Sequence, residues 1–368
     1  MEKLLELADI VLIPAPINGG QLGGQVNFMV EEKTDYSVPK SLPIFTSPME
    51  SIVGENSCRT WQDAGVRPVI PRTSPIQTRL ELCKVVFSAF SLQEAKQYFL
   101  NQDRRGIQSQ FHVSLDVGNG QSLELFNLAA ALKQKYQGQL LLMGGNVGNP
   151  EAYISYSKAG FDYIRIGISS CHLVDRDKYG FHYPMASLLL DIETIKKSKN
   201  MTIPRQVKII ADGGIRNYSD ILKALALGAD YVMIGKEFAR VKEAEGLIYR
   251  KDINQKTGEV TGISEVGNKV LPGCSGIEAK MNGLCRQYYG NTTPEMQALR
   301  AGYNNLEDWK KKKPTIKVSD SAWTWIDIDI TLREWIDEFK EVAGNGFLLS
   351  NSNDWAGFKK NIKYGRSC

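Results

Sequence analysis

The chain has 368 residues, 42% of them hydrophobic, which is enough to build a large core in one α/β domain. Its net charge of +4 excludes a strongly basic nucleic-acid-binding protein, and the lysine run at 310–313 is typical of a solvated loop. The N-terminus shows no basic region followed by an apolar stretch, and no apolar run reaches membrane-spanning length. We therefore expect a soluble cytoplasmic protein that binds neither a membrane nor nucleic acid.

Six cysteines and only three histidines are scattered along the chain without CxxC spacing. This pattern argues against a zinc site and against a disulfide framework, so a reducing compartment is expected. Five of the cysteines are interpreted as small buried apolar residues. Cys171 is the exception because of its position in the chain.

Short apolar segments that end in glycine or in a polar residue predict eight β-strands. In chain order they are 43–50, 67–71, 84–89, 112–116, 139–146, 163–167, 208–215 and 231–236. Helical patterns lie between most of them, at 58–64, 91–100, 123–136, 150–159 and 219–226. The helix at 91–100 opens with a capping box formed by Ser91 and Glu94. This alternation favours one (β/α)8 TIM barrel domain over residues 1–368, with a doubly wound open sheet as the rival fold.

Four further segments lie outside the strand–helix repeat. Segment 9–14 is expected to plug the bottom of the barrel or to cover its side. The connections at 168–207 and 242–330 are too long for plain crossovers, and we expect both to act as lids over the barrel mouth. The region from 331 to 362 predicts two helices that close the barrel.

Cys171 follows the end of a predicted strand, Gly167, and two serines. In a barrel, catalytic residues come from the C-terminal ends of the strands. Backbone N–H groups and a nearby lysine in such a loop favour a thiolate, which is a nucleophile for an electrophilic carbon.

Two neighbouring strand ends predict a nucleotide site. Asp212 is placed to accept hydrogen bonds from a ribose diol, and Gly213 and Gly214 let backbone N–H groups approach a phosphate, although the two glycines alone are also typical of a tight turn. Gly235 and Lys236 likewise place a glycine beside a charged residue at the end of the next strand. The last two strands of a barrel form its commonest phosphate site.

Polar and glycine residues also end the fourth and fifth strands, in Asp116-Val-Gly-Asn-Gly120 and Gly144-Gly-Asn-Val147. Either run is compatible with a simple turn. Both on one face predict a second ligand, flat and polar, beside the nucleotide.

Several motifs together resemble the IMP dehydrogenase/GMP reductase family, and the resemblance covers nearly the whole chain. They are Asp9-Ile-Val-Leu-Ile-Pro14, Thr46-Ser-Pro-Met-Glu50, Asp116-Val-Gly-Asn-Gly120, Gly145-Asn-Val147, Ile210-Ala-Asp-Gly-Gly-Ile215, Ala224-Leu-Ala-Leu-Gly-Ala229 with Val232-Met-Ile-Gly235, and Tyr289-Gly-Asn-Thr-Thr293. The motif at 116–120 is closer to the reductase version, and the stretch Gly180-Phe-His-Tyr-Pro184 resembles the reductase's Gly-Val-Gly-Tyr-Pro.

The resemblance implies roles residue by residue. Cys171 would attack purine C2, and Gly167 with Cys171 would line a loop that holds a monovalent cation, K⁺. The implied nucleotide site comprises Ser47, Met49, Ser169, Asp212, Gly213, Gly214, Gly235, Tyr289 and Gly290. Lys236 is added to this site from its place at the strand end; it replaces a small residue of the family and brings a positive charge that the family usually lacks. The implied site for the nicotinamide dinucleotide comprises Asp116, Gly118, Asn119, Gly145 and Asn146. The family also implies a homotetramer.

The sequence departs from the family near the chemistry. His172 and Leu173 stand where the family has a threonine after its cysteine, and Glu295 sits one position away from the reductase's glutamate. For the acid–base role we favour Glu295 first and His172 second; a plain alternative for Glu295 is a first-turn acid in the helix predicted near Pro294. The regulatory domains that many dehydrogenases insert after the second strand are absent.

The resemblance implies a purine-nucleotide oxidoreductase of the GMP reductase type, converting GMP and NADPH to IMP, ammonia and NADP. An IMP dehydrogenase that uses NAD is the alternative, and it would need a base on the lid at 242–330. A nucleotide-binding homologue without catalytic activity is the alternative of another class, because the threonine is missing.

Overall fold

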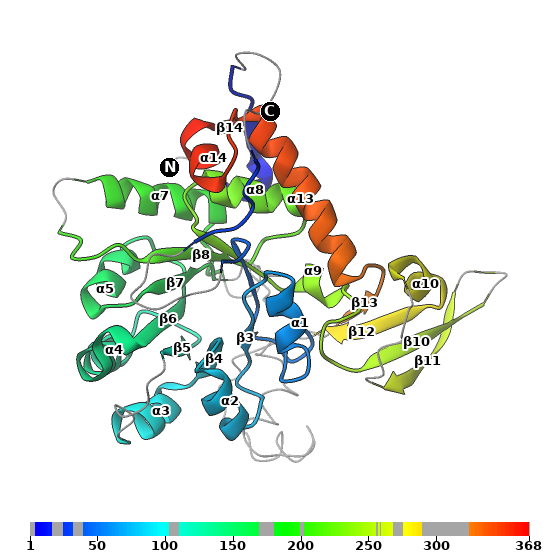
Figure 1. Cartoon of the computed structure of the whole chain (residues 1–368), viewed down its shortest axis with the longest axis horizontal. Helices are drawn as coiled ribbons and strands as arrows, with labels where there is room; N and C mark the ends of the chain where they lie inside the picture. The colour runs from blue at the N-terminus through cyan, green and yellow to red at the C-terminus, as the bar shows by residue number, and fades with distance from the viewer. Residues whose placement is uncertain are drawn as a thin grey trace.

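The structure is a computed structural model, and it describes residues 4–16, 25–31, 40–102, 110–168, 180–198, 202–254, 257, 259–267, 275–288 and 324–367. An eight-stranded parallel sheet forms its centre (Figure 1). The strands are β2 (Ile44–Thr46), β3 (Val69–Ile70), β4 (Phe87–Phe90), β5 (Phe111–Asp116), β6 (Leu140–Val147), β7 (Tyr163–Ile166), β8 (Lys208–Asp212) and β9 (Tyr231–Ile234). All eight predicted strands are confirmed.

The sheet closes on itself, which excludes the doubly wound alternative. β2 pairs with β9, the last strand of the sheet, and Phe45 of β2 also forms a parallel bridge with Arg67, just before β3. Two backbone hydrogen bonds make this bridge: Thr46 N–H to the Arg67 carbonyl and Arg67 N–H to the Ile44 carbonyl, both 2.9 Å. The fold is therefore a (β/α)8 barrel, as predicted.

Helices follow the strands around the outside. They are α1 (Cys58–Asp63), α2 (Ile76–Leu82), α3 (Leu92–Ala95), α4 (Leu123–Tyr136), α5 (Ala152–Ala159), α7 (Met185–Lys197), α8 (Tyr218–Ala226) and α9 (Lys236–Ala239). A π-helical turn, Lys96–Leu100, extends α3, and short 3-10 turns occupy Leu7–Asp9 and Gln137–Gln139. The predicted capping box is confirmed, since Ser91 Oγ accepts from the Glu94 N–H at 3.2 Å and Glu94 accepts from the Ser91 N–H at 2.8 Å.

Alternating side chains divide the apolar residues into two groups. Inward-facing residues, with Phe45, Tyr163 and Tyr231 at their centre, form one cluster inside the barrel. Their strand neighbours, such as Ile44 and Ile164, belong to a larger cluster between the strands and the helices. The inward position of Tyr163 matters for the site, because it makes every second residue of β7 point into the barrel.

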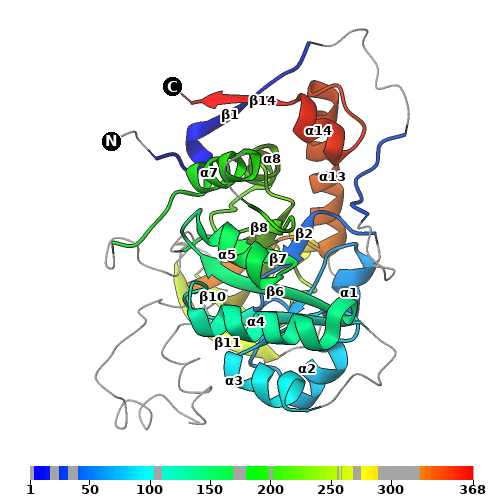
Figure 2. The same cartoon turned by 90° about the vertical axis from the view of Figure 1, so that its left-hand side faces the viewer.

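The two ends of the chain pair beside the barrel. β1 (Ile10–Ile13) runs antiparallel to β14 (Lys363–Arg366), and β1 packs against α8 (Figure 2). Segment 9–14 therefore covers the side of the barrel and does not plug its bottom. The two C-terminal helices are confirmed as α13 (Leu332–Leu349) and α14 (Trp355–Asn361), and both pack against α8.

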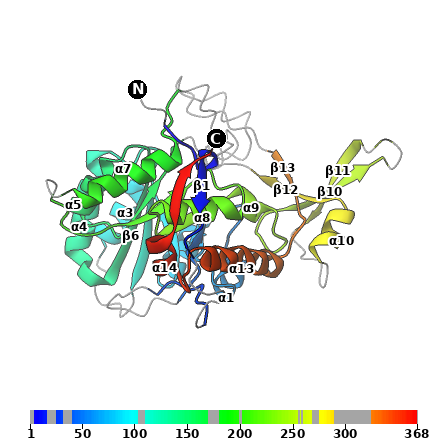
Figure 3. The same ribbon diagram turned by 90° about the horizontal axis from the view of Figure 1, so that it is seen from above.

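A second sheet lies within 242–330, where the sequence analysis placed no strand. Its four antiparallel strands are β10 (Ile248–Ile253), β11 (Val260–Gly267), β12 (Leu284–Tyr288) and β13 (Thr324–Asp327), with α10 (Gly276–Met281) beside them. Figure 3 shows β10 and β11 projecting from the barrel. The long connection at 168–207 likewise contains a crossover helix, α7. In the part of the chain that the structure describes, no helix combines the length and apolar composition needed to cross a membrane.

Candidate functional site

The polar residues predicted at separate strand ends meet at the C-terminal mouth of the barrel. Asn146, at the end of β6, donates through Nδ2 to Asp212 Oδ2 at 2.7 Å and to the Gly167 carbonyl at 3.1 Å. Three neighbouring strands are thereby tied together by one amide. The structure brings Asn146, Gly167 and Asp212 together as a single constellation, although the sequence analysis assigned them to three different roles.

Arg165 is the central charge of this constellation, and it was not among the residues predicted from the sequence. Its side chain is fully buried, and Nη2 donates to Asp116 Oδ1 at 2.7 Å and to the Gly145 carbonyl at 3.1 Å. Burial opposes the charge, but the carboxylates of Asp116 and Asp212 outweigh it and raise the pKa of Arg165. A signal was present: a charge within the apolar run 163–166, at a position that alternation points into the barrel.

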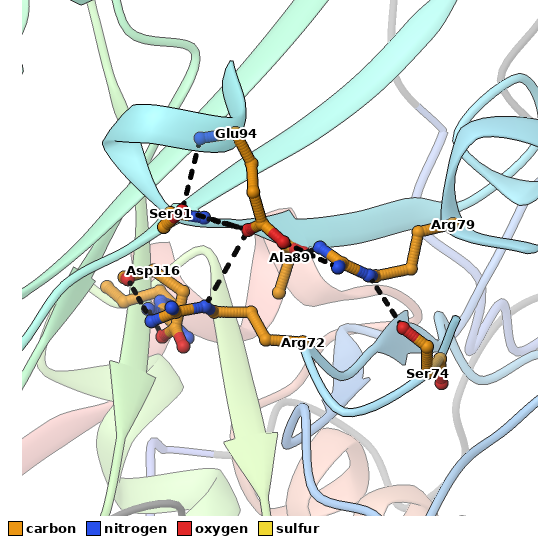
Figure 4. Close-up of polar contacts among 8 residues, drawn as sticks. Arg72, Ser74, Arg79, Ala89, Ser91, Glu94 and Asp116 are labelled. Carbon is orange, nitrogen blue, oxygen red and sulfur yellow. Dashed lines mark hydrogen bonds and ion pairs between the residues drawn. The ribbon is translucent and has the colours of Figure 1, made fainter. Parts of the chain in front are cut away.

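A second arginine approaches the same strand end from the loop after β3. Arg72 Nη1 donates to the Asp116 backbone carbonyl at 3.4 Å, and its Nε lies 4.0 Å from Glu94 Oε2 (Figure 4). Glu94 is itself held by Arg79 at 2.6 Å, and Arg79 lowers the pKa of Glu94 against the opposing effect of burial. Positive charge therefore lies on both sides of Asp116.

The carboxylate of Asp212 lies in an environment that disfavours its negative charge. Burial raises the pKa of Asp212 above its ordinary value of 3.8, and the attraction of Arg165 and the hydrogen bond from Asn146 offset this only in part. A carboxylate retained against such a cost is typical of a functional position.

The next two residues make the turn out of β8. Gly213 has φ +102° and Gly214 has φ +78°, which are backbone conformations that favour glycine. The turn leads to α8, whose N-cap Asn217 accepts from the Asp220 N–H at 2.9 Å. The predicted tight turn and the predicted approach to a helix N-terminus are thus both compatible with the observed backbone.

The loss of unfolding free energy caused by the Asp212 carboxylate can be measured by replacing this residue with asparagine. Because the folded chain holds this proton more tightly than the unfolded chain, Asp212 lowers the free energy of unfolding increasingly as pH rises above about 4. We expect Asp212→Asn to melt at the same temperature as the wild type near pH 4 and at a higher temperature at pH 7. On the sequence-based prediction that Asp212 accepts hydrogen bonds from a ribose, nucleotide affinity should fall by about ten- to a hundredfold, because the ribose would lose its charged acceptor.

Thermal melts between pH 4 and 7, together with nucleotide titrations, check this expectation. Asp220→Asn is the control, since Asp220 is a buried acid in the β8–α8 region but lies within α8. A variant at Asp212 that melts lower at pH 7 and binds nucleotide normally would assign the carboxylate a purely structural role.

Residues from three segments converge at the end of β9. A Cβ added at Gly235 would lie 2.8 Å from Tyr288 Oη, 3.3 Å from Ser47 Oγ and 3.6 Å from Met49 Sδ, so a side chain here would displace the Tyr288 hydroxyl. Ser47 also donates its backbone N–H to the Ile234 carbonyl at 2.9 Å. Tyr288 ends β12, so the second sheet meets the barrel mouth at this point.

Lys236 follows Gly235 and begins α9. It is partly exposed, and no carboxylate of the described residues pairs with it. Its charge is therefore available to an anion at the ends of β8 and β9.

The loop after β5 is more open. Gly118 and Asn119 are exposed, and Asn119 Oδ1 accepts from the Gln121 N–H at 3.1 Å, as in an ordinary turn. Gly120 donates its N–H to the Asn146 carbonyl at 2.9 Å, which joins this loop to the end of β6. The predicted cofactor residues thus lie on two connected loops, and their role stays a prediction.

Six predicted site residues lie outside the described residues: Ser169, Cys171, His172, Tyr289, Gly290 and Glu295. Three of the remaining cysteines are described, and Cys58, Cys83 and Cys285 are all buried, as predicted. Burial raises the pKa of Cys58 to about 11 and also raises the pKa of Cys285, so both thiols are held protonated at neutral pH.

The amino-acid sequence of the chain is similar to those of several known proteins. Residues 108–275 match the profile described as the IMP dehydrogenase / GMP reductase domain. Among curated proteins, the chain is 28% identical over 272 residues to the GMP reductase of Bacillus licheniformis, an alignment covering 68% of this chain and 76% of that protein. It is 29% identical over 266 residues to the GMP reductase of Bacillus subtilis, with coverages of 68% and 76%. The inosine-5'-monophosphate dehydrogenase of Chlorobaculum tepidum is 37% identical over 135 residues, which cover 36% of this chain and 26% of that protein.

Proposed function

Because this chain belongs to the IMP dehydrogenase/GMP reductase family, we propose that it is an NAD(P)-dependent purine-nucleotide oxidoreductase that works in the direction of GMP reductase. The observation that carries the proposal is the Asp212 carboxylate, retained at the end of β8 against the cost of burial and followed by two glycines with positive φ. The direction is supported by the relatives named GMP reductase, whose alignments span most of their length.

The chain's own residues would hold the nucleotide around the ends of β8 and β9. Asp212 would accept hydrogen bonds from the ribose hydroxyls, and the backbone of Gly213 and Gly214 would approach the phosphate. Ser47, Met49 and Gly235 already converge in one place, and we assign them the wall of the nucleotide pocket. Ser169, Tyr289 and Gly290 complete this proposed set.

Cys171 would carry the covalent step. A bond forms between Cys171 Sγ and purine C2, and the bond from C2 to the 2-amino nitrogen breaks as that nitrogen takes a proton and leaves as ammonia. A bound NADPH supplies the hydride that C2 gains when the sulfur leaves. Gly167 and Cys171 would line the loop that holds a monovalent cation, K⁺, whose positive charge would stabilise that loop.

The chemistry of the donor set fits a nicotinamide dinucleotide beside the nucleotide. Arg165 fixes the Asp116 carboxylate at 2.7 Å and the backbone of Gly145, while Arg72 adds a positive charge at the rim. We assign Asp116, Gly118, Asn119, Gly145 and Asn146 to this ligand. The phosphates of the cofactor would find positive charge on the Arg72 side.

Three broader properties belong to the same proposal. Tyr288 of β12 lies beside Gly235, which follows β9, and this supports a role for 242–330 as a cover over the barrel mouth. The buried free cysteines support a reducing, cytoplasmic setting. We further propose a homotetramer, which the mass of the protein in solution will test.

The phosphate contact of Lys236 is the first quantity to measure. A charge-assisted contact is worth roughly 1.5–3 kcal/mol. Lys236→Ala should therefore weaken the binding of nucleoside monophosphate by about ten- to a hundredfold and leave nucleoside binding almost unchanged. Calorimetric titration with GMP and with guanosine checks this, and an equal loss for both ligands would show that Lys236 does not meet the phosphate.

The proton of the leaving amine requires an acid within hydrogen-bond reach of C2. We expect Glu295→Gln to slow the chemical step by about a hundredfold, with little change in melting temperature or nucleotide affinity. His172→Ala tested in parallel decides between the two candidates in single-turnover measurements. Normal turnover in Glu295→Gln with loss in His172→Ala would assign the role to the histidine.

One pair of assays tests the function as a whole. The protein is mixed with GMP and NADPH, and separately with IMP and NAD⁺, while the absorbance of the reduced cofactor is followed. Loss of absorbance in the first mixture is expected. A gain in the second mixture alone would establish the dehydrogenase, and nucleotide binding without either change would establish a homologue without catalytic activity.

A further inference from the structure

Glu6, close to the N-terminus, reaches across to the start of α7. Its Oε1 lies 2.6 Å from His182 Nε2, and its Oε2 accepts from the Met185 backbone N–H at 3.3 Å. The adjoining backbone is held as well, since the Leu5 N–H donates to Ser187 Oγ at 2.8 Å and the Leu5 carbonyl accepts from the Ser187 N–H at 3.0 Å. Residues 5 and 6 are therefore docked on the beginning of α7.

α7 has no capping side chain of its own. Its N-cap, Pro184, makes no side-chain hydrogen bond, and its first turn contains no acid. Glu6 supplies the carboxylate that helix N-termini favour. Its position is fixed in turn by Asp9, which accepts from the Glu6 N–H at 2.9 Å and donates its own N–H to the Glu6 carbonyl at 3.1 Å.

His182 extends this contact to the end of β7. Its Nδ1 lies 3.3 Å from the backbone carbonyl of Ile168, and only 14% of its side chain is exposed. Ile168 directly precedes segment 169–179, and His182 follows that segment after Gly180 and Phe181. The imidazole therefore links the entrance of that segment to its exit, with Glu6 bracing the ring from the other side.

We propose that Glu6 and His182 form a positioning clamp, which sets the spacing between the two ends of segment 169–179 and so the placement of Cys171 within it. The inference rests on the proposed function, in which Cys171 is the nucleophile. The motif that 180–184 resembles has glycine where this chain has His182, so the ring belongs to this chain and not to the motif. Neither residue needs to touch the nucleotide, since misplacing a nucleophile by a small distance is enough to slow its reaction.

The test uses the full chain with Glu6→Ala, His182→Ala and the double variant. Two quantities are measured: kcat and KM for GMP, and the rate at which iodoacetamide alkylates Cys171, followed by mass spectrometry of its peptide. Each single variant should lower kcat by about tenfold, with KM changed by less than about threefold, and should change the alkylation rate. The double variant should be no worse than the more damaging single one, because both act through one contact.

Two further variants make the result specific. Glu6→Gln keeps the shape and an acceptor oxygen, so it should recover part of the loss. Glu124→Ala removes an acid from the first turn of α4, where Glu124 pairs with Lys96 at 2.6 Å, and should change neither readout. Additive losses in the double variant, or an unchanged alkylation rate with a lower melting temperature, would overturn the clamp. A wild type without turnover would overturn the proposed function alone, since alkylation still tests the clamp.

Discussion

Replacing Cys171 by alanine should reduce turnover by about 10⁴-fold or more while nucleotide binding stays nearly intact. In the proposed mechanism the Cys171 thiol forms the bond to purine C2, and no other described cysteine can take its place. Cys58, Cys83 and Cys285 are buried, and burial raises the pKa of Cys58 and Cys285. The groups assigned to the ribose and phosphate, among them Asp212 and Gly235, lie on other strands and should still bind GMP.

The measurement pairs a steady-state assay with a binding titration of GMP. Cys83→Ala is the matched control, because it removes a thiol that is buried away from the barrel mouth, where its Sγ faces the Leu80 carbonyl at 3.3 Å. Its turnover should be normal after correction for the fraction of folded protein. Full activity in Cys171→Ala would end the covalent mechanism, and loss of GMP binding would place Cys171 in the binding site instead.

Replacing Arg286 by methionine should cost about 3–5 kcal/mol of unfolding free energy. This side chain of β12 is fully buried, and its guanidinium donates to four backbone carbonyls between the last residue of α9 and the start of β10. Nη1 donates to Ala239 at 2.7 Å and Val241 at 2.9 Å, and Nη2 donates to Lys242 at 3.2 Å and Ala244 at 2.8 Å. Methionine would fill the space but remove the guanidinium donor from all four carbonyls, although Val241 also accepts from the Ala244 N–H at 3.1 Å.

Arg286 stays positively charged although its side chain is buried. Burial lowers the pKa of Arg286 to about 10, against the smaller opposing effects of Glu243 and Glu245, so the guanidinium remains protonated at neutral pH. The four hydrogen bonds are therefore charge-assisted, and they attach the second sheet to the barrel. Their loss should disturb the contact between Tyr288 and Gly235 and lower the global stability.

Urea unfolding followed by circular dichroism measures the effect on stability. Arg333→Met is the control, since Arg333 is an arginine of α13 whose side chain is 93% exposed, and its replacement should change stability by less than about 0.5 kcal/mol. Arg286→Lys should fall between wild type and Arg286→Met, because an ammonium cannot span four carbonyls. An unchanged unfolding midpoint in Arg286→Met would show that the carbonyls find other partners.

The local sequence was sufficient to predict the repeat that builds the barrel. Each strand is a short apolar run with a glycine or polar residue at its end, and α4 has the predicted bounds, 123–136. Ser91 and Glu94 made their capping box as expected. These features depend on residues within a few positions of one another, so periodicity and capping chemistry are enough to predict them.

The second sheet could not be predicted in this way. β11 has mostly exposed residues and contains glycine and polar positions, so its sequence lacks the alternation that marks a half-buried strand. It is a strand because β10 pairs with it, and that pairing is a tertiary event. The pairing of β1 with β14, from opposite ends of the chain, is another such event.

For the site, the residue types at the strand ends were enough to point to Asp116, Asn146 and Asp212. Which residues come into contact depends on the folded chain: the sheet closes through β2 and β9, Arg165 pairs with Asp116, and Glu6 contacts His182. The physical reason is the same in each case. A hydrogen bond or ion pair acts over about 3–4 Å, and the chain brings these partners within that range only when the whole barrel has closed.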